Sequence, residues 1–522
     1  MNGKKHILMV AAENDALVGG KVGGIGDVVR DVPIALADQG CLVDVLTPAY
    51  QLFSTIPGAD QVASFEVFFA GSFHQIKLLS VPPRSIVAGI RHWAMELPSE
   101  FYGSSSGIYF NDPPTAPFAT DATKFACFCT AVSTAIVSGK LSTPDIIHLH
   151  DWHSAFLLLL RDSDPEFSDL KKIRCVYTVH NLALQGTRPL SGHDSSLHSW
   201  FPGLDYQPVQ IVDRYANKCI NPMRTGINLA DKVHVVSPTY AREILRPSDQ
   251  EAGFIGGEGL QDDLVAAKSE DRLVGILNGC SYPESKYKKF TKKKLAELLG
   301  TEILSLINKR PNVDSSLFTA QVRVSSWLTQ KRPEMLVTSV GRITGQKVTI
   351  LRQELASGIS ALEALLMKLG SEGRLILLGS GDADLEQFLT DIAGRYDNLV
   401  FVKGYSEKLA DALYQSGDLF LMPSSFEPCG ISQMLSMRAG QPCLVHSVGG
   451  LIDTVIDDTN GFCFQGDSVE QQAENLVARF TEVMRLRQEN PGQYSAISKN
   501  ARAARFSWRN SAERYISELY TP

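Results

Sequence analysis

Short apolar runs that alternate with helical patterns constrain this chain more than any other feature of its sequence. Such runs lie at residues 7–12, 43–47, 146–149, 175–179, 232–236, 336–340, 375–378, 399–402 and 419–422. Their nearly continuous hydrophobicity is typical of parallel strands that are covered on both faces. Because helical patterns separate them, the sequence predicts an α/β fold of doubly wound parallel sheets.

The alternation stops after residue 279 and resumes near residue 336. A chain of 522 residues is long enough for two or three domains of ~100–200 residues each. We expect an N-terminal domain over 1–280, an atypical linker or insert over 281–332, a second α/β domain over 333–500 and a final helix within 501–522. Six lysines between residues 286 and 294 fit a solvated helix face better than a polyanion site.

The composition excludes several classes of protein. The net charge, 50 − 57 = −7, argues against nucleic acid or an anionic membrane as a partner. The sequence contains no apolar run of ~18 residues, so no membrane span is expected. Its nine cysteines are scattered, without zinc spacing, which favours reduced thiols and a cytoplasmic location.

A glycine-rich loop at residues 19–27 follows the first predicted strand. Its glycines would let the backbone approach a ligand closely, and Lys21 could neutralise a phosphate. The loop lacks both the dinucleotide fingerprint and the P-loop pattern. A purely structural turn is therefore an equal alternative.

Polar residues end two further strands of the first half. Residues 148–153 contain three histidines and Asp151, and residues 177–182 contain His180. Ligands of open sheets bind at such strand ends. A sugar or nucleotide pocket fits these residues better than a metal site, because residues 148 and 150 share a strand face that residue 153 leaves. The D-x-D patterns at 162–164 and 382–384 are too short to indicate a metal.

The second half carries a cationic loop and a single acid. Arg342 and Lys347 follow a strand and can converge on one diphosphate through charge-assisted bonds worth roughly 1.5–3 kcal/mol each. Glu427 precedes Pro428, which we expect near the first position of a helix. A mostly apolar stripe at 431, 434, 435 and 438 would then run to Gly440. An acid beside an anion-binding helix start suits group transfer from a diphosphate; a capped structural helix is the alternative.

Taken in order, these motifs resemble the bacterial and plant glycogen or starch synthases that use ADP-glucose. The carriers are residues 21–28, 150–154, 178–182 with 185–186, 236–243, 341–347 and 426–430. The resemblance implies a GT-B fold, in which two Rossmann-like domains face a cleft and a C-terminal helix crosses back to the first domain. It implies a retaining glucosyltransferase that moves glucose from ADP-glucose to the non-reducing end of an α-1,4-glucan, with no cofactor and no metal.

The resemblance also implies roles for particular residues. Lys21, Arg342 and Lys347 would meet the donor phosphates, Asp151, His180 and Asn221 would surround the glucose, and Tyr405 would lie against the adenine. Glu427 would hold the donor sugar near the reacting carbon. The full set is Glu427, Asp151, His180, Arg342 and Lys347 as catalytic residues, and Lys21, Gly23, Gly24, Asp27, Asn221, Tyr405, Cys429, Gly430, Ile431, Ser432, Gly449 and Gly450 as substrate-binding residues.

Several positions depart from the family pattern. The acid of a hinge motif is replaced at Ser281, a lysine is replaced by Arg224, and the acceptor-side loop at 102–104 differs. These changes leave two alternatives open. One is a related transferase that uses UDP-glucose or a small acceptor, and the other is a non-catalytic paralogue that binds glucan.

Overall fold

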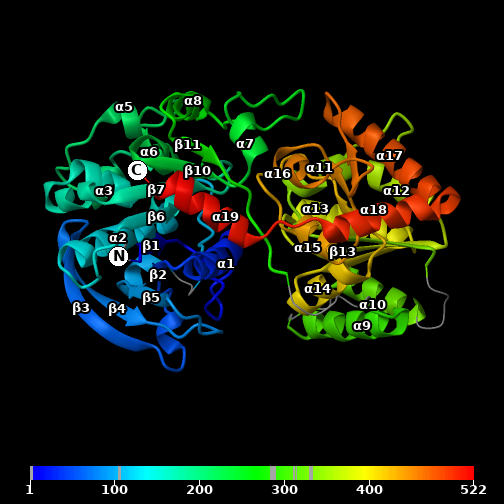
Figure 1. The fold of residues 1–522 in the computed structure, drawn as a ribbon, viewed down its shortest axis with the longest axis horizontal. Coiled ribbons are helices and arrows are strands. Elements are labelled where there is room, and N and C mark those ends of the chain that lie inside the picture. The colour runs from blue at the N-terminus through cyan, green and yellow to red at the C-terminus, as the bar shows by residue number, and fades with distance from the viewer. Residues whose placement is uncertain are drawn as a thin grey trace. The chain divides into compact units, whose positions relative to one another are not determined.

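The computed structural model describes residues 4–103, 107–282, 290–309, 312, 314–327 and 333–521. It divides into two compact units (Figure 1). Unit 1 comprises Met1–Ser248, Gly256–Gly279 and Ser507–Pro522, and unit 2 comprises Asp249–Ile255 and Cys280–Phe506. These borders differ by one residue from the predicted boundary at 280 and by six from that at 500.

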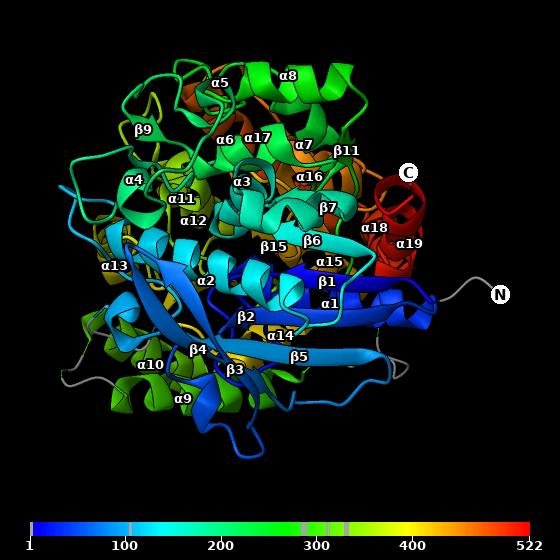
Figure 2. The same cartoon turned by 90° about the vertical axis from the view of Figure 1, so that its left-hand side faces the viewer.

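Unit 1 is built on one large sheet. Its strands are β1 (His6–Val10), β2 (Leu42–Pro48), β3 (Asp60–Phe69), β4 (Ser72–Ser80), β5 (Ile90–Glu96), β6 (Ile146–His150), β7 (Arg174–Val179), β10 (Lys232–Val235) and β11 (Leu273–Gly275). Their order among the described residues is β11-β10-β7-β6-β1-β2-β5-β4-β3 (Figure 2). Pairing is parallel from β11 to β5 and antiparallel at β4 and β3. A separate short ribbon pairs β8 (Arg188–Pro189) with β9 (Cys219–Ile220).

The strands β3 to β5 were not predicted, and their burial pattern gives the reason. In β3 only every second residue is buried towards its end, at Phe65, Val67 and Phe69. An antiparallel strand with one solvated face shows alternation instead of a continuous apolar run. The continuous apolar runs correspond to β1, β2, β6, β7 and β10, which are confirmed. The short parallel strand β11 was also not predicted.

The helices of unit 1 are α1 (Gly24–Asp38), α2 (Ala119–Val137), α3 (Phe156–Ser163), α4 (Leu197–Trp200), α5 (Pro208–Ile211), α6 (Pro222–Leu229), α7 (Pro238–Glu243), α8 (Gln261–Ser269) and α19 (Trp508–Arg514). The last helix continues as a π-helical turn over Tyr515–Leu519. α1 and α19 share a core with β1 and β2, in which Trp508, Tyr515 and Leu519 are buried. The C-terminal segment is thus part of the core of unit 1.

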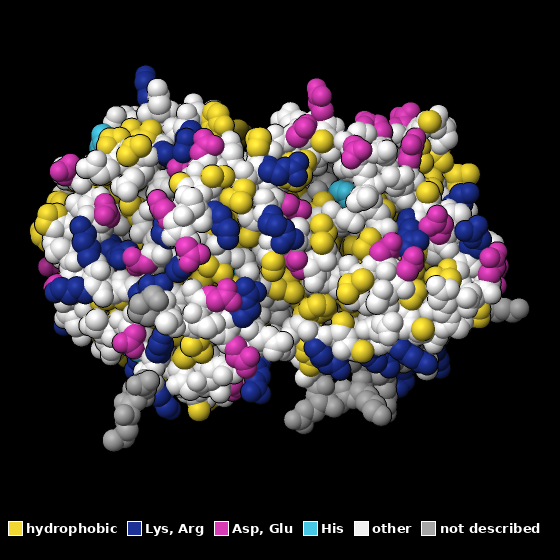
Figure 3. All heavy atoms as spheres, turned by 45° about the horizontal axis from the view of Figure 1, so that its top comes forward, with side chains coloured by type: hydrophobic (Ala, Val, Ile, Leu, Met, Phe, Trp, Pro, Cys, Tyr) yellow, Lys and Arg dark blue, Asp and Glu magenta, His cyan; other side chains and the backbone are white. Residues whose placement is uncertain are grey.

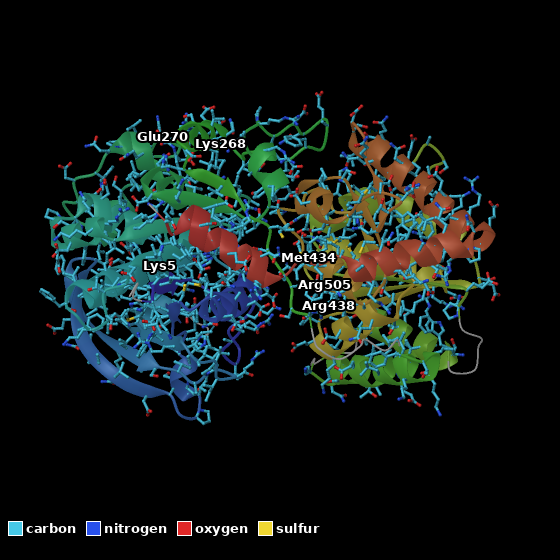
Figure 4. All side chains as sticks on the ribbon, viewed as in Figure 1. Lys5, Lys268, Glu270, Met434, Arg438 and Arg505 are labelled. Carbon is cyan, nitrogen blue, oxygen red and sulfur yellow. The ribbon has the colours of Figure 1, made fainter. Side chains whose placement is uncertain are left out.

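Polar contacts fasten this segment as well. The Nζ of Lys5, labelled in Figure 4, donates to the carbonyl oxygen of Tyr520 at 2.8 Å. The Nε of Arg174 donates to the carbonyl oxygen of Leu519, also at 2.8 Å. The indole N–H of Trp508 donates to Asp31.

Unit 2 has a fully parallel sheet in the order β14-β13-β12-β15-β16-β17 among its described residues. The strands are β12 (Met335–Val340), β13 (Gly373–Gly379), β14 (Leu399–Lys403), β15 (Leu419–Met422), β16 (Cys443–His446) and β17 (Phe462–Phe464). The four predicted strands in this half correspond to β12–β15 and are confirmed. Alternate residues of β13 enter separate cores, with Leu375 and Leu377 in one and Ile376 and Leu378 in the other.

Helices cover both faces of this sheet. They are α9 (Lys292–Asn308), α10 (Ser315–Trp327), α11 (Gly345–Arg352), α12 (Ala361–Leu369), α13 (Ala383–Arg395), α14 (Glu407–Ser416), α15 (Ser432–Arg438), α16 (Gly449–Thr454), α17 (Val469–Glu489) and α18 (Pro491–Ala503). α11, α12, α13 and α17 share the core of Leu375, whereas α9, α10 and α14 share that of Ile376.

The segment assigned from sequence to a linker or insert therefore contributes two helices to unit 2. Leu295, Leu299, Ile303 and Leu306 lie along one face of α9 and are buried in its core. Their spacing of four, four and three residues is helical, but the lysines before them and the prolines around them obscure this signal. The part of the lysine cluster at 286–289 lies outside the described residues.

Two chain segments lie side by side where unit 2 begins and ends. The amide of Cys280 donates to the carbonyl oxygen of Phe506 at 2.8 Å, and the amide of Phe506 donates to the hydroxyl of Tyr282 at 2.8 Å. The guanidinium of Arg505, labelled in Figure 4, lies 4.9 Å from the centre of the Tyr282 ring. Ser281, where the family's acid is replaced, accepts from Arg438 through its carbonyl oxygen.

We expect Trp508→Ala to destabilise unit 1 by ~3–5 kcal/mol, because the change removes a buried indole. Hydrogen exchange followed peptide by peptide should show lost protection in β1 and α1 and unchanged protection in β12 and β13. The matched control is Phe73→Ala, since Phe73 is 70% exposed, and it should change stability by less than ~0.5 kcal/mol. Unchanged protection of β1 in Trp508→Ala would contradict the role of the C-terminal segment.

Candidate functional site

The candidate residues form one group in each unit, at the carboxyl ends of parallel strands. In unit 1 they follow β1, β6 and β7 or start α6: Lys21, Gly23, Gly24, Asp27, Asp151, His180 and Asn221. In unit 2 they follow β12, β14, β15 and β16: Arg342, Lys347, Tyr405, Glu427, Cys429, Gly430, Ile431, Ser432, Gly449 and Gly450. Ligands of open α/β sheets bind at this edge.

The glycine-rich loop of unit 1 encloses a carboxylate of the chain itself. Glu13, 2% exposed, accepts from the amides of Val22 at 2.8 Å and Gly23 at 2.7 Å, and from the hydroxyl of Tyr109 at 2.8 Å. A Cβ on Gly26 would lie 3.1 Å from the same carboxylate. Glu13 was not predicted from the sequence, although an acid directly after an apolar strand and before a glycine loop is the pattern that marks it.

Lys21 and Asp27 pair with each other. The Nζ of Lys21 lies 2.7 Å from Oδ1 of Asp27, which also lies 3.2 Å from Arg30. Asp15 completes this group through ion pairs with Arg30 and with Arg84. Lys21 in the loop and Arg30 after it are therefore both balanced by carboxylates, and a phosphate would compete with Asp27 for Lys21.

Asp151 holds an unusual backbone conformation at the end of β6. Its φ of 54° and ψ of −178° fall in a region that essentially only glycine adopts, at a cost of order 1–3 kcal/mol. Its Oδ1 accepts from the backbone amide of His180 at 2.7 Å. Burial raises the pKa of the Asp151 carboxyl to about 7, although backbone amides of His180 and Asn181 oppose the shift. Strain of this kind clusters at functional sites.

Two fully buried histidines, His148 on β6 and His234 on β10, belong to one chain of hydrogen bonds. The carbonyl oxygen of Ile276 accepts from His234 Nε2 at 3.2 Å, which fixes the proton of that ring on Nε2. His234 Nδ1 must then accept from the Thr178 hydroxyl at 2.9 Å, and Thr178 must accept from His148 Nε2 at 2.6 Å. His148 Nδ1 therefore accepts from the hydroxyl of Tyr520 at 2.6 Å. One carbonyl thus sets every donor in a chain that links three strands to the C-terminal segment.

Asn221 is fully buried, and its side chain is bonded within the protein. Its Oδ1 accepts from the amide of Arg224 as the N-cap of α6. Its Nδ2 donates to Gln185 at 2.6 Å and to Asp213 at 2.8 Å. This geometry gives Asn221 a role in positioning α6. Arg224, which stands where the family pattern has a lysine, forms two hydrogen bonds with Asp263.

Lys347 and Glu427 form the centre of the candidate site in unit 2. Their side chains form an ion pair, and the hydroxyl of Ser424 lies 3.2 Å from Lys347 Nζ and 3.3 Å from Glu427 Oε2. Gln346 joins the two loops, because its Nε2 donates to Phe426 O at 2.6 Å and its carbonyl oxygen accepts from the amide of Ser425 at 2.9 Å. Ser424 and Gln346 were not predicted as site residues, because serine and glutamine occur in many contexts and give no distinctive signal.

The helix after Glu427 begins later than predicted. Pro428 lies in a loop and α15 starts at Ser432, because Gly430 has a φ of +76° that no right-handed helix accommodates. The fully buried residues are Gln433, Met434, Ser436 and Met437, and Leu435 is partly buried against the core that contains Met437. The predicted stripe is therefore confirmed at Met434 and Leu435 but does not describe the whole buried face. Cys429 and Ile431 belong to this loop, and Ser432 is the first residue of α15. The anion-binding role expected for this helix start stays a prediction.

Gly449 and Gly450 bring another loop against Glu427. The amide of Gly450 donates to the carbonyl oxygen of Glu427 at 3.1 Å. A Cβ at Gly450 would lie 2.3 Å from the carbonyl oxygen of Cys429, so only glycine permits this approach. Gly449 has a φ of +46°.

Arg342 and Tyr405 both lie at the surface of unit 2. Arg342 is exposed and has neither a hydrogen bond nor an ion pair with any described residue. Tyr405 is 56% exposed and follows Gly404, whose φ is +140°. An accessible guanidinium and an accessible ring are what a diphosphate and a base require, respectively.

Within the described residues, no three or more His, Cys, Asp and Glu side chains are grouped to hold a metal ion. Asp162 and Asp164 instead line a cavity of about 510 Å³ beside Trp200 and Phe201, away from the candidate residues. Charged side chains of both signs are interspersed on the face shown in Figure 3. No helix of the described chain is both long and apolar enough to cross a membrane.

Protein-family comparisons account for both units. The model of the starch synthase catalytic domain matches residues 6–266, and that of the group 1 glycosyl transferases matches residues 330–503. Glycogen synthases from Aliivibrio salmonicida and Streptococcus gordonii are 30% and 32% identical to this chain. The alignments cover 98% of this chain and 98% and 99% of these relatives, respectively. The chain belongs to the glycogen and starch synthase family.

Solved structures agree with this membership. The catalytic domain of starch synthase IV from Arabidopsis thaliana, bound to ADP and acarbose, has a TM-score of 0.76 at 26% identity and 99% coverage of both chains. Sucrose-phosphate synthase from Thermosynechococcus elongatus has a TM-score of 0.54 at 19% identity, covering 99% of this chain and 98% of that one, and shares the fold alone. The predicted family, the two Rossmann-like domains of GT-B type and the assignment as a glycosyltransferase are confirmed.

The buried Asp151 carboxyl predicts a pH-dependent difference in stability. Its raised pKa means that the folded chain binds this proton more tightly than the unfolded chain, so the resulting stability is complete below about pH 4 and is lost as the pH rises through about 7. Asp151→Asn has no carboxyl that titrates at this position, so it does not lose stability in this way as the pH rises. Its free energy of unfolding relative to the unchanged protein should therefore increase from pH 4 to pH 7.

Denaturant unfolding at several pH values measures this difference. Asp205→Asn, at an exposed position, is the matched control and should show a difference that does not change with pH. A pH-independent difference for Asp151→Asn would contradict the assignment.

Proposed function

We propose that this chain is a retaining α-glucosyltransferase that moves glucose from ADP-glucose to the non-reducing end of an α-1,4-glucan. The observation that carries the proposal is the Lys347–Glu427 ion pair in the strand-end group that also contains Arg342. Membership of the glycogen and starch synthase family supports it. The ADP and acarbose bound to the Arabidopsis relative support a nucleoside diphosphate donor and a glucan acceptor.

The chemistry needs stabilisation of a leaving diphosphate. As the bond between glucose C1 and the phosphate oxygen breaks, the electron pair stays on ADP and positive charge develops on the sugar. The C4 hydroxyl of the acceptor forms the new bond to C1, and its proton passes to the diphosphate oxygen that leaves. Arg342 and Lys347 supply fixed positive charge where ADP becomes more negative, which lowers the barrier electrostatically. We assign Lys21 to the same diphosphate, in exchange for Asp27.

Glu427 holds Lys347 and faces the donor sugar in this proposal. Its carboxylate is bonded by Lys347 and lies beside Ser424, so we assign it to positioning and to stabilising the positive sugar. Tyr405 would stack on the adenine, and Asp151 with His180 would contact the glucose. We also propose a metal-independent reaction and a cytoplasmic location; the nine cysteines, all free, support the latter.

We expect Arg342→Ala to lower kcat/KM for ADP-glucose by roughly 10- to 100-fold, the loss of one charge-assisted bond to phosphate. Since Arg342 has no partner among the described residues, its removal should leave the unfolding transition unchanged. The control Arg352→Ala lies ten residues away in the same unit, in an exposed pair with Asp384, and should keep full activity. Equal activity of both variants would contradict the role of Arg342.

A donor-by-acceptor assay tests the proposal as a whole. ADP-glucose and UDP-glucose are each incubated with glycogen, maltose or buffer, with and without EDTA. The proposal expects transfer from ADP-glucose to glycogen that EDTA leaves unchanged. Preferential use of UDP-glucose or maltose would indicate the related transferase, and glycogen binding without ADP release would indicate a non-catalytic paralogue.

A further inference from the structure

The rings of His148, His150 and His180 form a stack at the ends of β6 and β7, which lie side by side in Figure 2. The centres of His148 and His150 are 4.5 Å apart, and those of His150 and His180 are 5.3 Å apart. Nδ1 of His150 lies 3.0 Å from Nε2 of His180. Burial lowers the pKa of His180 to about 3 and that of His150 well below its ordinary value, so both rings are neutral at neutral pH.

A neutral imidazole carries one proton, so the bond between these rings has two possible directions. If His180 Nε2 donates, the proton of His150 must lie on its own Nε2. That atom is buried and has no hydrogen-bond partner among the described residues. If His150 Nδ1 donates, the same buried atom is only an acceptor. Buried N–H groups without an acceptor are rarer than acceptors without a donor, which favours donation from His150.

His148 does not change the direction of the hydrogen bond between His150 and His180. Both nitrogens of His148 are engaged, one by the hydroxyl of Tyr520 and the other by Thr178. His148 therefore touches His150 only through its ring face. His180 is left as the sole hydrogen-bond partner of the His150 side chain among the described residues.

With Nε2 accepting, the proton of His180 lies on Nδ1. No described residue is bonded to that atom, and the side chain is only half-buried. We propose that His150 is a positioning residue that fixes neutral His180 as an Nδ1–H donor for a hydroxyl oxygen of the transferred sugar. The contact with the sugar rests on the function proposed above, whereas the assignment of the His180 proton to Nδ1 does not.

Histidine side-chain NMR of the full chain, labelled with ¹⁵N-histidine, tests the tautomer without any substrate. The His180 signals are assigned by their loss in His180→Asn. We expect a protonated Nδ1 and an unprotonated Nε2 in the unchanged protein. A protonated Nε2 on His180 would overturn the proposal.

Two variants of His150 test whether this residue fixes the tautomer of His180. His150→Phe keeps a stacked ring but lacks the donor, so His180 should revert towards the Nε2–H form that free neutral histidine prefers. His150→Asn places an amide N–H near the position of the His150 Nδ1 and should restore the Nδ1–H form of His180. This variant still tests the role of His150 if His150→Phe does not fold. His198→Phe, at an exposed position, is the control and should leave His180 unchanged. An Nδ1–H form that persists in a folded His150→Phe protein would overturn the role of His150.

Deoxy analogues of the glucosyl donor test the sugar contact. In the unchanged protein and in His150→Asn, one analogue that lacks a single hydroxyl should be transferred at least tenfold less efficiently than the parent. In His150→Phe this ratio should fall towards one. If the tautomer is as expected but no ratio changes, the sugar contact is overturned. If no donor is transferred at all, the proposed function fails while the NMR result still decides the tautomer.

Discussion

Parallel pairing of strands covered on both faces is the constraint on which the rest of this structure depends. Such strands need a crossover for every new strand, and their carboxyl ends meet at one edge. The loops after β1, β6 and β7 are therefore brought together in unit 1, and those after β12, β14, β15 and β16 in unit 2. Residues as distant in sequence as Lys347 and Glu427 become partners because their strands share an edge.

Carboxylates of the chain pair with two of the three candidate phosphate-binding cations at these edges. Glu13 occupies the amides of the glycine loop, Asp27 pairs with Lys21, and Glu427 pairs with Lys347. Each carboxylate keeps a cation or a set of amides in place in an otherwise poorly solvated environment, where an unpaired charge would be costly. In the proposed function, a diphosphate would replace Asp27 as the partner of Lys21. Arg342 is different, because no described carboxylate holds it.

The sequence allowed nine of the parallel strands to be predicted, since short continuous apolar runs such as that of β13 are typical of strands buried on both faces. The parallel strands β5, β11, β16 and β17 were not predicted. Prediction also failed where burial is one-sided, as in β3, and where lysines and prolines masked the periodicity of α9. At the candidate site, charged residues in motifs were identified readily. Ser424, Gln346 and Glu13 were not, because their importance arises from contacts with residues far away in the chain. The delayed start of α15 depends on the backbone conformation of Gly430, which a pattern of residue types does not reveal.

The backbone of Asp151 has a consequence for how this position can vary. Its dihedral angles would suit glycine, yet only an acceptor side chain can bond the amide of His180. The backbone angles favour glycine at this position, whereas the bond to His180 requires a side chain that accepts. Random substitution there should therefore seldom yield a chain that both folds stably and forms this bond.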